Sequence, residues 1–200
     1  MRAAVVVVLG LAAACTPDIA PGSYLCGPER SCPEDQACDG VTNICVLPSQ
    51  VQPFACPPPG ETTEVEPNDD TVNAQLIANL ACVSRTAEIV GCARDLDSED
   101  WFLFDAPQGC TAVAVEARLT FPLAFEVLSL EVRGSTGLTI ASGGDCAISD
   151  ADDGDEQRCL DVPLTSGSRY ALRVARSGVG TCGGACAHNK YTLTLQLKTP

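Results

Sequence analysis

Oxygen-bearing side chains crowd a short stretch of the chain, Glu-Val-Glu-Pro-Asn-Asp-Asp, at positions 64–70. Alternate residues of an extended chain share one face, and the proline favours an extended backbone at the residue before it. Ca²⁺ takes roughly six to eight ligands of this kind, namely carboxylate and amide oxygens. The stretch is therefore either half of a calcium site or a solvated acidic linker. Its candidate ligands are Glu64, Glu66, Asn68 and Asp69.

A second acidic segment precedes Trp101 and Phe102. Asp97 and Asp100 fall in a predicted loop that runs into a strand, so they could close a metal cage from the other side. On the residues alone, a solvated linker beside a polar turn is favoured over a cation site. Only a resemblance to a known family would favour the cation site over the linker.

Other reactive groupings point away from catalysis. Cys182, Cys186 and His188 could begin a zinc site, but a disulfide is favoured in an exported protein. The acidic loop between Cys146 and Cys159 lacks the glycine and glutamate positions of an EF-hand, and a hairpin loop closed by a disulfide is expected there. No Gly-x-Ser-x-Gly or His-Glu-x-x-His motif is present, so we predict that the protein is not an enzyme.

The N-terminus predicts export. Residues 1–14 have the form of a secretory signal peptide that is too short to span a bilayer. The sequence Leu-Ala-Ala-Ala-Cys at 11–15 resembles a bacterial lipobox, which implies acylation of Cys15 and a membrane anchor. By the same resemblance, Thr16 in place of aspartate implies transport to the outer membrane, facing the periplasm or the outside. The alternative is an ordinary signal peptide cleaved near Ala14.

Composition restricts the partners. The chain carries 26 acidic and 12 basic residues, with a net charge of −14, so no basic face for nucleic acid is expected. An acidic surface does suit divalent cations. Thirteen cysteines less Cys15 leave an even number, which indicates disulfides.

Two regions differ in their physics. Residues 15–50 contain little apolar material, so we predict a small disulfide-rich stalk module held together by cross-links. Its four cysteines allow three pairings; the interleaved one, Cys26–Cys38 with Cys32–Cys45, is preferred because it resembles EGF-like knots. A proline-rich linker follows at 51–63, and its Cys56 is expected to pair with a cysteine further along the chain.

Residues 64–200 alternate apolar and polar side chains, most regularly in the segment 190–198. Such alternation is typical of half-buried antiparallel strands. We predict an all-β domain, a jelly-roll-like antiparallel β-sandwich of about eight strands, with one short helix at 71–80. The predicted strands cover 87–93, 100–105, 111–119, 125–133, 137–142, 158–164, 168–176 and 190–198.

The order of these features resembles the bacterial pre-peptidase C-terminal (PPC) domain, a β-sandwich family that includes the collagen-binding modules of secreted collagenases. The resemblance covers 64–198 and rests on Glu-Pro-Asn-Asp, on the acidic run before Trp101, and on Gly-x-x-Tyr-x-Leu-x-Val at 167–174. In calcium-binding members the two acidic segments share the metal. Carried over, this implies the same six ligands, with Asp95 as a substitute. The chain has only three tyrosines, so collagen binding is not implied.

These observations together predict a lipid-anchored protein of the bacterial cell envelope. Its calcium-stabilised sandwich would serve as a binding or structural module, with a protein or carbohydrate ligand as the partner and the oligomeric state left open. The alternative is an accessory or substrate-binding module of a secreted protease or polysaccharide-degrading system. Aromatic side chains clustered on one sheet would favour a polysaccharide ligand, and a bare polar surface would favour a structural role.

Overall fold

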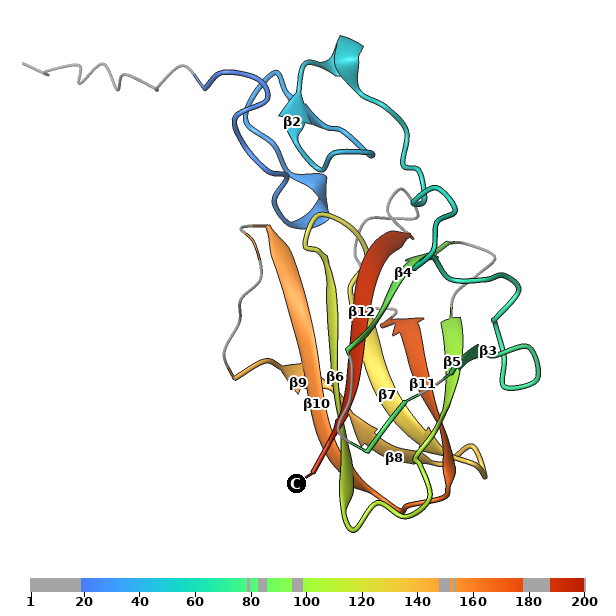
Figure 1. The fold of residues 1–200 in the computed structure, drawn as a ribbon. Coiled ribbons are helices and arrows are strands. Elements are labelled where there is room, and N and C mark those ends of the chain that lie inside the picture. The colour runs from blue at the N-terminus through green and yellow to red at the C-terminus, as the bar shows by residue number, and fades with distance from the viewer. Residues whose placement is uncertain are drawn as a thin grey trace, which may run out of the picture.

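A computed structural model describes residues 19–78, 80–82, 86–94, 99–147, 152, 154–177 and 188–199. A small cysteine-rich module sits at one end of an elongated β-sandwich (Figure 1). Within these ranges no helix is long and apolar enough to cross a membrane. The expectations for Cys15, Asp95, Asp97, Cys182 and Cys186 fall outside the described residues.

Cross-links hold the module together, because it has almost no apolar core of its own. Its regular elements are very short: η1 (Pro28–Arg30), β1 (Ala37–Cys38), β2 (Cys45–Val46) and η2 (Pro48–Gln50). Disulfides join Cys26 to Cys38 and Cys32 to Cys45, which confirms the interleaved pairing. The buried apolar residues that the module itself supplies are three half-cystines, Cys26, Cys38 and Cys45.

The module packs directly on the sandwich. Ala124 and Phe125, from the loop after the sandwich strand β6 (Val113–Pro122), are buried among the module's cystines. The ring of Phe54 lies 5.2 Å from that of Phe125 and 3.9 Å from that of His188. The Arg30 amide donates to the Ala124 carbonyl at 3.0 Å. The linker therefore does not hold the two regions apart.

Two five-stranded sheets form the sandwich (Figure 1). Every neighbouring pair is antiparallel except the edge strand β3, which runs parallel to β5. The first sheet has the order β4 (Ala87–Ala93), β12 (Asn189–Lys198), β6 (Val113–Pro122), β10 (Asp155–Leu164) and β9 (Gly144–Asp145). The second has the order β3 (Gln75–Ile77), β5 (Glu99–Asp105), β11 (Arg169–Arg176), β7 (Leu128–Gly134) and β8 (Thr139–Ser142).

The apolar residues of the alternating segments form the core of the sandwich. Along β12, Tyr191, Leu193, Leu195 and Leu197 are buried while the residues between them are only partly covered. They meet Phe102, Phe104, Leu130 and Leu172 from the second sheet in one cluster, the sandwich core. The predicted all-β antiparallel sandwich is confirmed, and a strand occupies each of the eight predicted segments.

The predicted helix at 71–80 is wrong. Asp70 Oδ1 accepts hydrogen bonds from the backbone amides of Val72 and Asn73, both at 2.8 Å, and these bonds lower the pKa of Asp70. A side chain that closes a turn in this way competes with helix formation. The chain then enters β3, where Leu76 pairs beside Leu103 of β5.

Three further disulfides fasten the sandwich. Cys56 of the linker pairs with Cys92 on β4, which confirms the expected partner further along the chain. Cys146 pairs with Cys159, which confirms the disulfide expected to close the acidic hairpin loop. The bridge between Cys82 and Cys110 was not anticipated.

Candidate metal site

Three carboxylates converge at the module end of the sandwich. One oxygen from each of Glu64, Glu66 and Asp100 lies within 4.8 Å of the other two. Glu64 is positioned by β4, since its amide donates to the Val90 carbonyl at 3.0 Å. Asp100 begins the inward-facing row of β5 that continues with Phe102, and it is fully buried. A strand edge and a core position thus bring together the two acidic segments.

Tyr191 ties two of these carboxylates together. Its hydroxyl lies 2.8 Å from Glu64 Oε2 and 2.7 Å from Asp100 Oδ2. A tyrosine hydroxyl has one proton and donates to only one of them, so the other contact is a hydrogen bond when that carboxyl group is protonated. Burial and the adjacent charge of Asp100 raise the pKa of Glu64 to about 8. Without a cation, the site therefore keeps a proton on Glu64 near neutrality.

Gly91 makes room for this arrangement. A Cβ atom at this position of β4 would overlap the ring of Tyr191 and lie 2.5 Å from Glu64 Oε2. The next amide, that of Cys92, donates to Glu64 Oε1 at 2.7 Å. Neither Gly91 nor Tyr191 was predicted from the sequence to be part of the site. A lone glycine inside a regular strand is a signal of close approach that could have identified the first.

Asn68, two residues from Glu66, carries a buried side-chain amide. Its side chain is 0% exposed, and within the described part of the chain neither its Oδ1 nor its Nδ2 has a hydrogen-bond partner. Its backbone is fixed, since the carbonyl accepts from the Trp101 amide at 2.9 Å and the amide donates to Glu66 Oε2 at 3.1 Å. A buried polar group without a partner costs about 1–3 kcal/mol. A cation bound by the Asn68 oxygen would offset that cost.

The predicted ligands are thus placed unevenly. Glu64, Glu66 and Asp100 come together, and Asn68 lies buried in the same segment. Asp69 is exposed and is not one of the three clustered carboxylates. The candidate ligand atoms are all oxygens, from the three clustered carboxylates and from the Asn68 amide in the same segment. Such a set fits a hard divalent cation.

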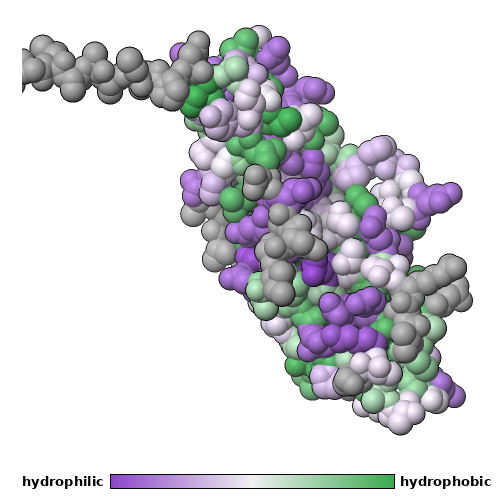
Figure 2. All heavy atoms as spheres, turned by 60° about the vertical axis from the view of Figure 1, so that its left-hand side comes forward, coloured by the Kyte–Doolittle hydropathy of each residue, from purple (hydrophilic) through white to green (hydrophobic). Residues whose placement is uncertain are grey.

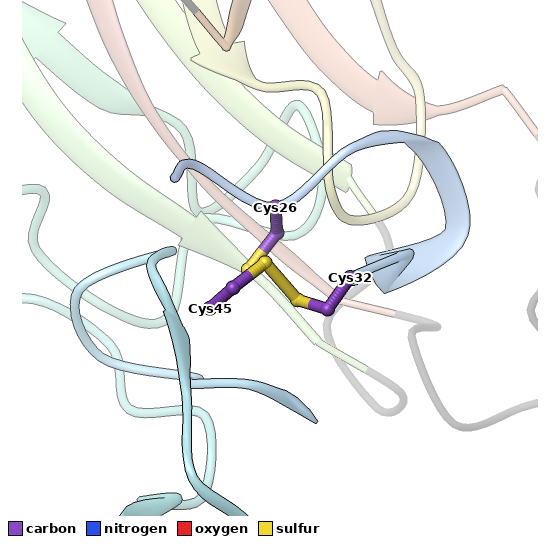
Figure 3. Close-up of side chains that lie close together, drawn as sticks. All are labelled: Cys26, Cys32 and Cys45. Atoms are coloured by element: carbon purple, nitrogen blue, oxygen red, sulfur yellow. A yellow bond between two sulfur atoms is a disulfide. The ribbon is translucent and has the colours of Figure 1, made fainter. Parts of the chain in front are cut away.

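Three sulfur atoms form a second close group, in the module. Cys26, Cys32 and Cys45 present their sulfurs within 4.8 Å of one another (Figure 3). All three belong to disulfides, and a disulfide sulfur is not the thiolate that zinc requires. The group is explained by two neighbouring bridges.

The face of the sandwich seen in Figure 2 is mainly polar. In the view of Figure 2, hydrophilic residues cover much of the sandwich, with small hydrophobic areas between them. Among the described residues, Tyr24 in the module is the one aromatic side chain with large exposure. Trp101 is only 7% exposed, and its ring lies 5.2 and 5.8 Å from the guanidinium groups of Arg133 and Arg173. No broad aromatic platform is present on the described surface.

Comparison with known proteins identifies similar folds only. No family model matches the chain, and no curated protein matches its sequence. The pre-peptidase C-terminal domain of a Bacillus anthracis collagenase is 14% identical, with a TM-score of 0.38 over 62% of this chain and 94% of that one. PliG of Salmonella Typhimurium, a periplasmic inhibitor of g-type lysozyme, is 16% identical, with a TM-score of 0.38 over 62% of this chain and 100% of that one. PliG of Aeromonas hydrophila is 11% identical, with a TM-score of 0.35 over 62% of this chain and 95% of that one. A PPC domain is thus among the similar structures, and no function follows from similarity at this level.

Proposed function

We propose that the protein is a lipid-anchored component of the bacterial cell envelope whose sandwich is a calcium-stabilised binding or structural module without catalytic activity. One observation carries the calcium role. Three carboxylates converge, and Asn68, whose backbone amide donates to one of them, Glu66, has a buried side-chain amide with no partner in the described part of the chain.

The chemistry of the donors favours Ca²⁺ over other common cations. Zn²⁺ sites rely on nitrogen or sulfur ligands, and this cluster offers neither. Mg²⁺ demands strict octahedral geometry and gives up its waters reluctantly, whereas Ca²⁺ accepts irregular oxygen sets. The cation would link residues 64–68 to the start of β5, so its role would be to fasten the entry segment to the sandwich.

Export is supported by the five disulfides together with the N-terminal sequence. The anchor is tested by replacing Cys15 with serine in a Gram-negative host. We expect Cys15→Ser to lose radiolabelled palmitate and to leave the membrane fraction, while Thr16→Ser keeps both. Unchanged palmitate labelling of Cys15→Ser would remove the anchor from the proposal.

The calcium role is tested by thermal unfolding of the disulfide-intact mature chain, with calcium or with a chelator. A ligand that binds only the folded state stabilises it by about 2.7 kcal/mol at a hundredfold excess over its Kd. We expect the melting temperature to rise with calcium, and Glu66→Gln and Asp100→Asn each to abolish most of the rise.

Glu88→Gln is the matched control, since Glu88 is an exposed glutamate on the neighbouring strand β4 and lies outside the cluster. It should respond to calcium as the wild-type protein does. A calorimetric titration that shows no heat of binding and no change in melting temperature at millimolar calcium would overturn the calcium role.

A further inference from the structure

A hollow of about 390 Å³ lies on the outer face of the second sheet. Leu103 and Ala171 line it, together with Trp101, Arg169 and the turn 134–137 between β7 and β8. Its volume falls at the small end of the range for ligand sites, roughly 300–1,000 Å³. The hollow does not include any of the clustered carboxylates.

The floor of the hollow is apolar and lies below the neighbouring side chains. Ala171 on the central strand β11 pairs with Leu103 on β5 and with Arg133 on β7, so these three side chains share the outer face. The alanine contributes only a methyl group, and this leaves a depression between taller neighbours. Trp101, one row along from Leu103, borders the same space.

The rim is polar but carries no net charge. The turn 134–137, Gly-Ser-Thr-Gly, contributes hydroxyl and backbone groups on one side. At the end of the hollow Arg169 forms a two-point ion pair with Asp105, at 2.7 and 2.9 Å, and both side chains are 54% exposed. Because the pair uses only Nε and Nη2 of the arginine, it still offers donors and acceptors to a ligand.

From this combination we infer that the hollow is a binding site for a neutral saccharide. A sugar ring has an apolar C–H face and a polar edge of hydroxyl groups. In this hollow the aliphatic floor of Leu103 and Ala171, and not a broad aromatic platform, would contact the apolar face, so a short saccharide fits better than a long polysaccharide. The exposed Arg169–Asp105 pair presents donors and acceptors side by side for such hydroxyls. The charges of Arg169 and Asp105 cancel each other, so the pair does not attract a charged ligand. The whole chain has a net charge of −14 and repels acidic ligands, so an uncharged ligand fits better than an acidic one.

Two other ligand classes fit the hollow less well. An extended peptide is bound through free backbone groups at a sheet edge, but β11 is paired on both sides, with β5 and with β7. An acyl chain needs an enclosed apolar cavity, and this hollow is bordered by an exposed ion pair.

The hollow runs along the outer face of the sheet from Trp101 to Arg169, which pairs with Asp105. Asp100, in the metal cluster, is the second residue of β5 at the module end, and Asp105 is the last residue of the same strand at the opposite end. The inference goes beyond the proposed calcium role and does not depend on it. The two therefore fail separately: one by loss of the thermal response to calcium, the other by loss of saccharide binding.

The test is an NMR titration of the ¹⁵N-labelled mature chain in saturating calcium and again in chelator. The probes are neutral hexasaccharides of β-linked glucose, xylose, mannose and N-acetylglucosamine. We expect at least one probe to shift the amide signals of Gly137 and Ala171 and the indole signal of Trp101. Ala171→Leu fills the floor and should abolish these shifts. Arg169→Gln should weaken binding roughly tenfold, the usual effect of removing a charged hydrogen-bond partner.

Arg158→Gln is the matched control, because Arg158 forms a comparable ion pair with Asp145 at 2.8 Å on the other sheet. It should bind the probe with wild-type affinity. The inference is wrong if none of the four saccharides moves these signals, or if binding survives both Ala171→Leu and Arg169→Gln. It is also wrong if a neutral peptide of serine, alanine and leucine moves the signals while the saccharides do not.

Discussion

The module and the sandwich are ordered by different means within one chain. In the module the buried apolar cluster consists of Cys26, Cys38 and Cys45, together with two residues that the sandwich supplies, Ala124 and Phe125. In the sandwich, aromatic and aliphatic side chains from both sheets fill a continuous core. Folding must overcome a large loss of chain entropy. The module limits that loss with covalent links, whereas the sandwich offsets it by burying apolar surface.

The comparison also shows that the module is not self-sufficient. Phe125, a residue of the sandwich, is buried among the cystines of the module, and Phe54 and His188 pack against its ring. A region of this size has too little apolar surface to fold without help. Its order therefore depends on cross-links and on contact with the sandwich.

The largest effect should come from the core of the sandwich. Phe102 is 0% exposed, and Phe102→Ala should lower the free energy of unfolding by roughly 3–5 kcal/mol, through lost burial and the cavity left behind. Urea unfolding followed by the fluorescence of Trp101 measures this loss. Leu138→Ala, at a side chain that is 72% exposed, is the control and should stay within about 0.5 kcal/mol of the wild type. Equal losses in the two variants would show that the described core does not carry the stability.

A smaller loss of stability, confined to the module, should follow from removing one of its disulfides. Replacing Cys32 and Cys45 with serine opens a loop with a sequence separation of 13 residues. Such a cross-link is worth about 3 kcal/mol in the chain-entropy model. We expect the module to become sensitive to protease at 19–50, while the sandwich keeps its cooperative unfolding.

The bridge between Cys146 and Cys159 is a matched control, because it closes a loop with the same separation of 13 residues inside the sandwich. Its double serine variant should lose a comparable amount of stability and yet stay folded, since the core remains. If both variants left the module equally protected from protease, the contrast between the two regions would be wrong.

The smallest effect concerns pH. Because the pKa of Glu64 is raised from 4.5 to about 8, the folded metal-free protein holds a proton that the unfolded chain has lost between these values. The free energy of unfolding contributed by this group should therefore fall as the pH rises through that window. Calcium needs the ionised carboxylate, so the stabilisation by calcium should grow over the same window.

Thermal unfolding across this pH window, with calcium and with chelator, measures both slopes. Glu64→Gln cannot ionise and should flatten both of them. A stabilisation by calcium, taken as the difference between the two conditions, that does not grow across this window would contradict the assignment of the raised pKa to the cation site.

Local patterns were enough to predict much of the architecture. Alternation placed the strands, because it depends on neighbours in the sequence. Cysteine spacing left three pairings open within the module, and the resemblance to EGF-like knots selected the interleaved one that the structure has. The bridge from Cys82 to Cys110 depends on how distant segments meet, and no local pattern encodes it. The helix prediction failed because one side chain, Asp70, closes a turn instead.

The candidate site was predicted only in part, for the same reason. Acidic composition identified Glu64, Glu66 and Asp100, but the role of the Tyr191 hydroxyl depends on the register of β12 against β4, which sets Tyr191 opposite Gly91. The hollow likewise requires three strands in register around Ala171. Features of this kind are set by pairing between strands that lie far apart in the sequence.

The bridge between Cys56 and Cys92 has a mechanical consequence. Tension that enters through the module would pass from Cys56 directly to β4, so the loop 57–91, which includes the acidic segment, would bear none of it. Tension that leaves at the far end of β12 would then pull β4 and β12 past each other along their length (Figure 1). Their backbone hydrogen bonds would share the force in shear, instead of breaking one after another as in peeling.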